Sequence, residues 1–242
     1  MEEKLITIGE AAKLMGLSID TLRRMDEDGR FPAIRQGEKG YRYYYKNNIN
    51  IYLSDLLKLA KNWVTSDKGI LSGDFYCANS AVFQSKLSRL QDSLEKVTDE
   101  NIKKIFPLVV AVAGEIGDNS FAHNIGNWPD IPGIFFGFDL NKRQVILADR
   151  GQGILKTLSR VRPELQDDMS ALKVAFTEVV SGRAPEERGN GLKFVRAVVT
   201  KSLLGLYFQS GKARLDLERD SSELHIKESG FDFHGCLALI TF

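Results

Sequence analysis

The sequence has few of the residues that mark specialised protein classes. It contains two cysteines in 242 residues, too few for a disulfide framework or a four-cysteine zinc site. It also lacks a charge excess, because 33 Lys and Arg side chains and 32 Asp and Glu side chains give a net charge of +1. A uniformly basic nucleic-acid-binding surface is therefore excluded, and any nucleic-acid site must be local.

Long hydrophobic runs are missing as well. The longest apolar run, from Phe106 to Gly114, is shorter than the ~20 residues that cross a bilayer. The N-terminus, MEEKLITIGE, is acidic and lacks the apolar core of a signal peptide. The composition, 43% hydrophobic and 27% charged, is typical of a globular protein. We therefore expect a cytoplasmic protein that does not associate with a membrane.

A polar stretch divides the chain. Residues 65–74, TSDKGILSGD, are rich in Gly, Ser and Asp, which is typical of a loop, and they follow a helical pattern from Ile51 to Trp63. The sequence therefore predicts a small domain at residues 1–55, a helical linker at 56–74 and a larger domain at 75–242.

The N-terminal segment has the pattern of two short helices. Thr7 and Glu10 have the spacing of a capping box, and Gly16 is typical of a helix end. Ser18 is a second cap candidate, and the helix that it starts continues to Gly29. Two short helices joined by a glycine-containing turn predict a helix-turn-helix.

A hairpin pattern follows these helices. FPAIRQGEKGYRYYYKN predicts two short strands around Gly37 to Gly40, which would form a wing. In a winged module the second helix reads bases, and the wing here would place Arg35, Lys39 and Arg42 on phosphates. The alternative is a small protein-interaction module with solvated arginines. On the first interpretation, four arginines are candidates for contact with duplex DNA: Arg23, Arg24, Arg35 and Arg42.

The run ITIGEAAKLMGLSIDTLRRMDEDGRFPAIRQGEKGYRYY resembles the winged helix-turn-helix of the MerR and excisionase families. The pieces IGEAAKLMGLS and TLRRMDEDGRFP and the wing Tyr41-Arg42-Tyr43 carry the resemblance, which implies DNA binding. MerR regulators continue into a long dimerisation helix and an effector domain that often binds metal. Neither that helix nor a cysteine cluster follows here, so those two properties are not implied. Because residues 1–50 are near-neutral, DNA binding is expected to need a homodimer or paired half-sites.

The larger part contains a helical pattern with polar residues at regular intervals. In LVVAVAGEIGDNSFAHNIG, residues 108–126, Glu115, Asn119 and His123 follow one another every four residues. One face of the predicted helix therefore carries a carboxylate, an amide and an imidazole. His123 alone is better explained as a packed side chain than as a catalyst.

Two glycine-containing stretches follow. In VILADRGQGI an apolar strand ends at Asp149, and Gly151 and Gly153 come directly after it. Glycines at such a place let a ligand approach the backbone closely. In EERGNGLKFVRAVV, Gly189 and Gly191 precede a helix, whose first N–H groups can bind an anion. Each feature alone also fits an ordinary turn or helix start.

The order of the three stretches resembles the GHKL superfamily of Bergerat-fold ATPases, which includes gyrase-type topoisomerases, histidine kinases and mismatch-repair ATPases. The motifs are Glu-x-x-x-Asn, Asp-x-Gly-x-Gly and Gly-x-Gly-Leu, and the resemblance runs from about residue 75 to the C-terminus. LYFQSGKARLDL looks like the family's hairpin, and GCLALITF looks like its closing strand, with Cys236 where Thr is frequent. The implied fold class is α+β, a winged helix-turn-helix plus a two-layer α/β sandwich with a mixed, mainly antiparallel sheet.

The resemblance implies ATP and Mg²⁺ as cofactors and assigns roles to three polar residues. Asn119 would bind Mg²⁺ through its side-chain oxygen, and Asp149 would accept a hydrogen bond from the adenine amine. Glu115 would be the general base, since a carboxylate there can orient an attacking water.

The remaining assignments concern the backbone. Gly151 and Gly153 would let adenine and ribose lie against their loop. Gly189, Gly191 and Leu192 would surround the phosphates.

Together these patterns predict a DNA-binding regulator whose ATP state controls binding to duplex DNA or to a protein partner. Whether it hydrolyses ATP slowly or only binds it stays open. Residues 80–105 hold no phosphoacceptor histidine, which disfavours an autokinase. The alternatives are an anti-sigma-type protein serine kinase and a non-catalytic ATP-binding scaffold.

Overall fold

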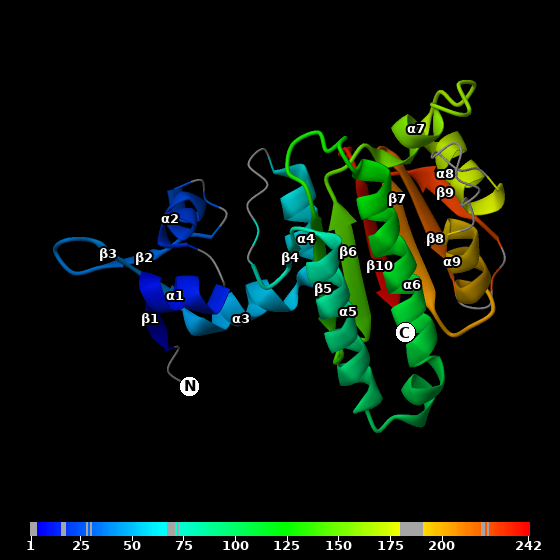
Figure 1. Ribbon diagram of the computed structural model, residues 1–242. Helices are drawn as coiled ribbons and strands as arrows, with labels where there is room; N and C mark the ends of the chain where they lie inside the picture. The colour runs from blue at the N-terminus through cyan, green and yellow to red at the C-terminus, as the bar shows by residue number, and fades with distance from the viewer. Residues whose placement is uncertain are drawn as a thin grey trace. The chain divides into compact units, whose positions relative to one another are not determined.

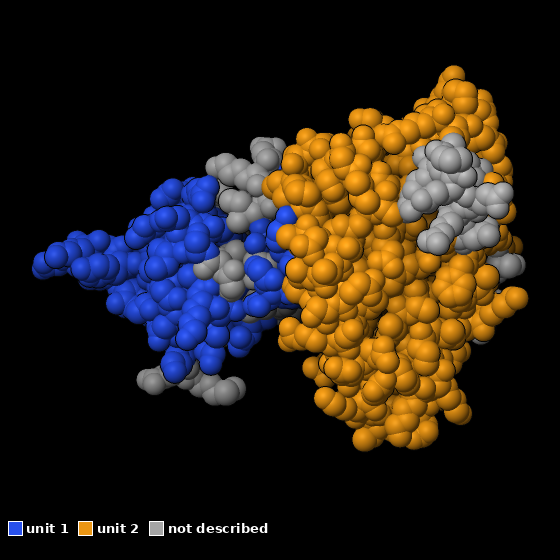
Figure 2. Space-filling model, viewed as in Figure 1, with its two compact units in different colours: residues 1–76 blue, residues 77–242 orange. Residues whose placement is uncertain are grey.

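The chain folds into two compact units, Met1–Tyr76 and Cys77–Phe242, coloured blue and orange in Figure 2. The computed structural model describes residues 4–15, 18–27, 29, 31–66, 71, 73–179, 191–218, 221 and 223–242. The boundaries predicted at residues 55 and 74 stay predictions.

The first unit contains the two short helices and the hairpin that the sequence predicts. Its described elements are β1 (Leu5–Thr7), α1 (Ile8–Met15), α2 (Ile19–Glu27), β2 (Ile34–Gln36), β3 (Tyr41–Tyr45), α3 (Lys46–Ser54) and α4 (Leu56–Thr65). The strands form an antiparallel sheet in the order β1-β3-β2. Buried side chains such as Met15, Leu22, Tyr44 and Ile49 join the helices to this sheet.

Local hydrogen bonds explain where these helices begin. The backbone N–H of Thr7 donates to Glu10 Oε2 over 2.9 Å, and the backbone N–H of Glu10 donates to Thr7 Oγ1 over 3.3 Å, which is a capping box. Ser18 Oγ accepts from the backbone N–H of Thr21 at the start of α2. The hairpin turn contains Gly37 at φ 74° and Gly40 at φ 61°, values that favour glycine.

The helical stretch predicted from Ile51 to Trp63 is interrupted at Asp55. The structure has two helices there, α3 and α4, and Asp55 lies between them with φ −100° and ψ 71°. The side chain of Asp55 accepts a hydrogen bond from the backbone N–H of Lys58 and so caps α4. A residue that can cap a new helix competes with helix continuation.

The second unit is a sheet with helices on one face, as predicted (Figure 1). Its helices are α5 (Ser80–Glu95), α6 (Glu100–Asn124), α7 (Gly153–Leu158), α8 (Asp168–Thr177) and α9 (Gly191–Val199). Its strands are β4 (Tyr76–Cys77), which begins at the last residue of the first unit, β5 (Ile134–Asp139), β6 (Gln144–Asp149), β7 (Gly205–Ser210), β8 (Ala213–Leu217), β9 (His225–Glu228) and β10 (Cys236–Thr241).

The strand order is β4-β5-β6-β10-β7-β8-β9. Along the sheet, every pairing between β5 and β9 in this order is antiparallel. The predicted hairpin corresponds to β7 and β8. The predicted closing strand corresponds to β10, which lies in the middle of the sheet. Alternate side chains of these strands, such as Leu147, Ala238 and Phe208, pack with α5, α6, α8 and α9 in one core. This places the end of β6 beside α6.

Helix α6 is longer than predicted, because it begins at Glu100 rather than at Leu108 and contains Pro107. Among the described helices it is the one whose length and composition would allow it to cross a membrane. In this structure it lies on the sheet, and Val109, Val112 and Ile116 are buried in the core. It is therefore a core helix of the second unit.

Candidate functional site

A cavity lies in the second unit beside the C-terminal half of α6. Its walls come from α6, the end of β6, α7, α8, the start of α9, β7 and β10. They consist of Ile116, Asn119, Ser120, His123, Asn124, Asp149, Gly153, Ile154, Thr157, Leu158, Ala175, Gly191, Leu192, Phe208 and Cys236. Apolar walls with a few convergent polar groups are typical of a small-molecule site.

The carboxylate of Asp149 is the most deeply buried polar group of this cavity. The residue is 2% exposed. Ser120 Oγ donates to its Oδ2 over 2.7 Å, and the backbone N–H of Gly151 donates to its Oδ1 over 2.8 Å. Burial raises the pKa of Asp149 to about 6, although the hydrogen bonds from Ser120 and Gly151 oppose this rise. A buried carboxylate at a cavity wall can accept further hydrogen bonds from a ligand.

The raised pKa has a consequence for stability. The folded state binds this proton more tightly than the unfolded chain does, because the ordinary pKa of the group is 3.8. Its contribution to the free energy of unfolding is therefore fully present below pH 4 and is lost as the pH rises towards 6. At neutral pH the ionised carboxylate of Asp149 destabilises the folded chain.

Glycines give the cavity its shape. A Cβ at Gly191 would lie 2.0 Å from Glu115 Oε1 and 2.7 Å from Asn119 Nδ2, so a side chain there would clash with α6. A Cβ at Gly151 would lie 2.1 Å from Asn124 Nδ2. Gly153 has φ 76°, a conformation that favours glycine. The backbone therefore approaches α6 more closely than a residue with a side chain would allow.

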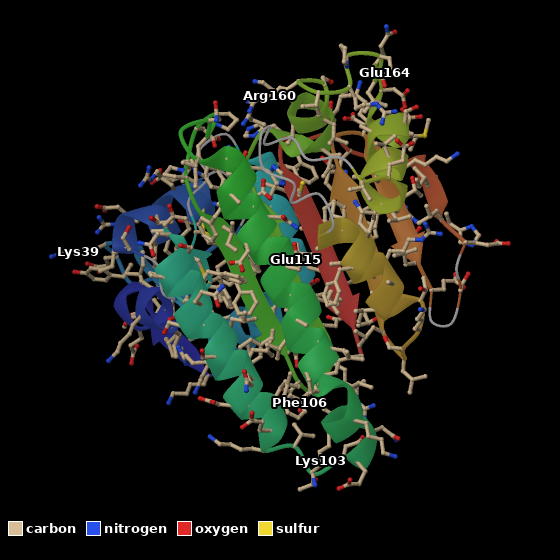
Figure 3. All side chains as sticks on the ribbon, turned by 45° about the vertical axis from the view of Figure 1, so that its right-hand side comes forward. Lys39, Lys103, Phe106, Glu115, Arg160 and Glu164 are labelled. Carbon is tan, nitrogen blue, oxygen red and sulfur yellow. The ribbon has the colours of Figure 1, made fainter. Side chains whose placement is uncertain are left out.

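Glu115 and Asn119 interact on the face of α6 that meets α9. Asn119 Nδ2 donates to Glu115 Oε1 over 3.1 Å, and Figure 3 shows Glu115 near the middle of the helix. This bond orients the side-chain amide of Asn119. The Oδ1 atom of Asn119 accepts no hydrogen bond from any residue that the structure describes. The described part of the chain holds no group of three His, Cys, Asp or Glu side chains suited to a metal.

The structure brings most of the predicted site residues together. Asn119, Asp149, Gly153, Gly191 and Leu192 line the cavity. Outside this lining set, Glu115 bonds to Asn119 and Gly151 packs on Asn124. Gly189 lies outside the described residues.

The candidate DNA-contacting arginines of the first unit all have internal partners. Arg23 forms an ion pair with Asp20 over 2.9 Å, and its side chain is 51% exposed. Arg24 Nε donates to the backbone carbonyl of Asp20 over 3.3 Å. Arg35 and Arg42 both contact Asp26. Arg23 and Arg24 lie on α2, the second helix of the helix-turn-helix.

Comparison with known families decides what kind of module the first unit contains. Residues 7–44 match the model of the MerR family regulatory protein. This match covers α1, α2 and the hairpin, and it gives the first unit a MerR-type helix-turn-helix. No curated protein matches the chain.

The solved structures that resemble the chain include the following two. One is the 43K ATPase domain of Thermus thermophilus gyrase B in complex with an aminocoumarin, at 14% identity and a TM-score of 0.34 over 67% of this chain. The other is the N-terminal domain of a DNA repair protein, at 13% identity and a TM-score of 0.30 over 64% of this chain. The chain spans 40% of each of those chains.

Several residues that line the cavity were not predicted as site residues, among them Ser120 and Asn124 of α6. Asn124 Oδ1 accepts from the backbone N–H of Gln152 over 2.8 Å and so ties α6 to the segment after β6. Ser120 and Cys236 reach the cavity from α6 and β10. Ser120 and Asn124 are four residues apart, so the periodicity that selected Asn119 could also have selected them. No sequence pattern indicates that Ser120 bonds to Asp149.

Beside the cavity, a cluster of charged and polar side chains in the second unit anchors the segment that follows Asp149. Arg150 is 4% exposed and forms an ion pair with Asp130, which precedes β5. His234 Nδ1 lies 3.0 Å from the backbone carbonyl oxygen of Arg150. These contacts hold three loops together at the end of β6.

Proposed function

We propose that the chain is a cytoplasmic DNA-binding regulator that binds ATP in the cavity of its second unit. Bound nucleotide then controls its binding to DNA or to a protein partner. The observation that carries the proposal is the gathering of Asn119, Asp149 and Gly191 around one cavity, because these residues are far apart in the sequence. The MerR-type module at residues 7–44 supplies the DNA-binding part.

The chemistry of the cavity fits adenine. The 6-amino group of adenine donates hydrogen bonds, and the buried carboxylate of Asp149 accepts them. Ile116, Ile154 and Phe208 offer apolar surface for the flat ring. Guanine has a carbonyl oxygen at that position, which a carboxylate would repel, so the cavity favours ATP over GTP.

The start of α9 fits a phosphate group. Gly191 is the first residue of this nine-residue helix, so its first N–H groups are not used within the helix. Helix N-termini of this kind attract anions. The missing side chain at Gly191 leaves room beside Glu115 and Asn119. The phosphates would therefore lie between α9 and α6.

The residues at that place also fit Mg²⁺. This ion keeps several waters and needs only one or two protein oxygens when phosphates complete its shell. Asn119 offers Oδ1, since its Nδ2 is already bonded to Glu115. Bound Mg²⁺ would neutralise phosphate charge.

Glu115 is the candidate catalytic residue. Its Oε1 accepts from Asn119, which holds the carboxylate in place. Its Oε2 accepts no hydrogen bond from the described part of the chain. This oxygen is therefore available to orient a water molecule and take its proton.

ATP binding in the second unit and DNA binding by the first unit can be coupled thermodynamically. If ATP changes the affinity of the chain for DNA by some factor, then DNA must change the affinity of the chain for ATP by the same factor.

A homodimer on paired half-sites would strengthen the DNA binding of the near-neutral first unit.

Calorimetry of the full chain with ATP and Mg²⁺ tests the nucleotide part of this proposal. We expect saturable binding of one ATP per chain and weaker binding of GTP under the same conditions. The assignment of the cavity would be contradicted by no binding of ATP, or by tighter binding of GTP. Tight ATP binding with no turnover would instead favour the non-catalytic scaffold.

A further inference from the structure

The end of α2 carries a buried carboxylate that joins it to the hairpin. The Asp26 side chain is 8% exposed, and it accepts from Arg35 over 2.5 Å and from Arg42 Nε over 2.7 Å. It also accepts from the backbone N–H of Ala33 over 2.8 Å. Burial opposes ionisation, yet the bonds from Ala33 and Arg42 and the charge of Arg35 hold the pKa of Asp26 below its ordinary value. Asp26 is therefore a charged link between α2 and the hairpin β2–β3.

The hairpin needs this carboxylate. Arg35 and Arg42 are directly opposite each other in the β2–β3 register, and like charges at such positions destabilise a strand pair. Asp26 lies against both of them and compensates the repulsion. Arg42 is further held by Glu27 over 3.1 Å, and its side chain is only 19% exposed. Its guanidinium is thus committed to two carboxylates.

The turn of the hairpin carries a basic side chain whose contacts differ from those of Arg42. Lys39 lies in the turn between Gly37 and Gly40, is exposed, and forms no ion pair with any residue that the structure describes. Figure 3 shows it at the outer end of the hairpin. A phosphate could reach Lys39 without breaking an internal contact, whereas Arg42 would have to leave Asp26 and Glu27.

We propose that Asp26 and Arg42 are positioning residues that hold the hairpin in its DNA-binding orientation, and that Lys39 makes the hairpin's phosphate contact. This inference rests on the proposed DNA binding of the first unit. It differs from the sequence-based hypothesis, in which Arg35 and Arg42 contact phosphates directly, together with Lys39. Arg42 then acts on DNA only through the placement of the hairpin.

The two accounts predict opposite effects for the same substitution. Removing a negative charge near DNA normally strengthens binding, because it reduces repulsion from the phosphates. If Arg42 contacts a phosphate directly, Asp26→Asn frees its guanidinium and should tighten binding. If Asp26 positions the hairpin, Asp26→Asn leaves Arg35 and Arg42 side by side with only Glu27 to compensate their charges, and should weaken binding.

The experiment uses the full chain and a fluorescent duplex that the wild-type chain selects from a random pool, titrated by anisotropy at two salt concentrations. Asp26→Asn should weaken binding by about tenfold, since the shared partner of two arginines is lost. Glu38→Gln removes the same charge from the exposed turn and is the matched control, which should bind at least as tightly as wild type. Lys39→Ala should make the salt dependence shallower by about 0.9 in log–log slope.

Arg42→Lys keeps the result interpretable if Asp26→Asn disturbs folding, which circular dichroism would detect. It retains the charge but cannot span Asp26 and Glu27 as the guanidinium does. We expect binding nearly as weak as for Arg42→Ala. Wild-type affinity of Arg42→Lys, or tighter binding by a folded Asp26→Asn, would overturn the inference. If the wild-type chain selects no duplex, the proposed DNA binding fails instead.

Discussion

Asp149→Asn should weaken ATP binding by roughly 100-fold, because a hydrogen-bond acceptor for the adenine amine is replaced by a group that also donates. The carboxylate is buried and already accepts from Ser120 and Gly151, so no solvent can compensate for the mismatch. Calorimetry near neutral pH measures this change. Asp139→Asn, at the end of the neighbouring strand β5, is the matched control and should bind ATP as wild type does.

The same variant should be more stable than wild type when no nucleotide is bound. Asparagine has nearly the same shape as aspartate but no buried charge, and the rise of the pKa of Asp149 from 3.8 to about 6 corresponds to roughly 3 kcal/mol. Thermal unfolding above pH 6 should therefore shift upward in Asp149→Asn, and this gain should vanish near pH 4. Unchanged ATP affinity in Asp149→Asn would refute the role of Asp149. If the variant were less stable than wild type, unfolding would explain a loss of ATP affinity.

Glu115→Gln should lower the rate of ATP hydrolysis by at least about 100-fold, the usual contribution of a general base. ATP should still bind, because the amide can accept from Asn119 Nδ2 as the carboxylate does. Asn119→Ala should in addition lose the Mg²⁺ dependence of binding. Phosphate release under single-turnover conditions measures the first effect, and calorimetry with and without Mg²⁺ measures the second.

Asp118→Asn is the matched control for this experiment. Asp118 is also on α6, but it is exposed and accepts from Gln84 on α5. Its substitution should leave hydrolysis unchanged. An equal loss in Asp118→Asn would show that the effect is not specific to Glu115. If the wild-type chain shows no turnover over hours, the hydrolytic role is wrong and the scaffold alternative is favoured.

The first unit shows which features can be predicted from sequence. Its helix starts depend on contacts three residues apart, such as Thr7 with Glu10, and its turn depends on Gly37 and Gly40. Such local signals are visible in a single sequence. The break at Asp55 is also local, yet the sequence pattern does not indicate it because apolar residues continue on both sides of it.

The candidate site shows what could not be predicted. The spacing of Glu115 and Asn119 predicted that they share one face of a helix, and in the structure they are hydrogen-bonded there. The bond between Ser120 and Asp149 joins residues 29 positions apart, and the contact between Arg42 and Asp26 joins residues 16 apart. Contacts of this kind depend on how elements pack, which periodicity does not encode. For the same reason, the sequence does not indicate that the charge of Arg42 is already paired with Asp26 and Glu27.

The most direct test of the account is the effect of nucleotide on DNA binding by the full chain. The selected duplex is titrated by anisotropy in the presence of Mg²⁺, with and without a saturating non-hydrolysable ATP analogue, using wild type and Asp149→Asn. The account predicts that the analogue shifts the DNA affinity of wild type by about 5-fold or more and leaves that of Asp149→Asn unchanged. Equal DNA affinity of the wild-type chain with and without the analogue, at concentrations where calorimetry shows the cavity filled, would contradict control of DNA binding by nucleotide.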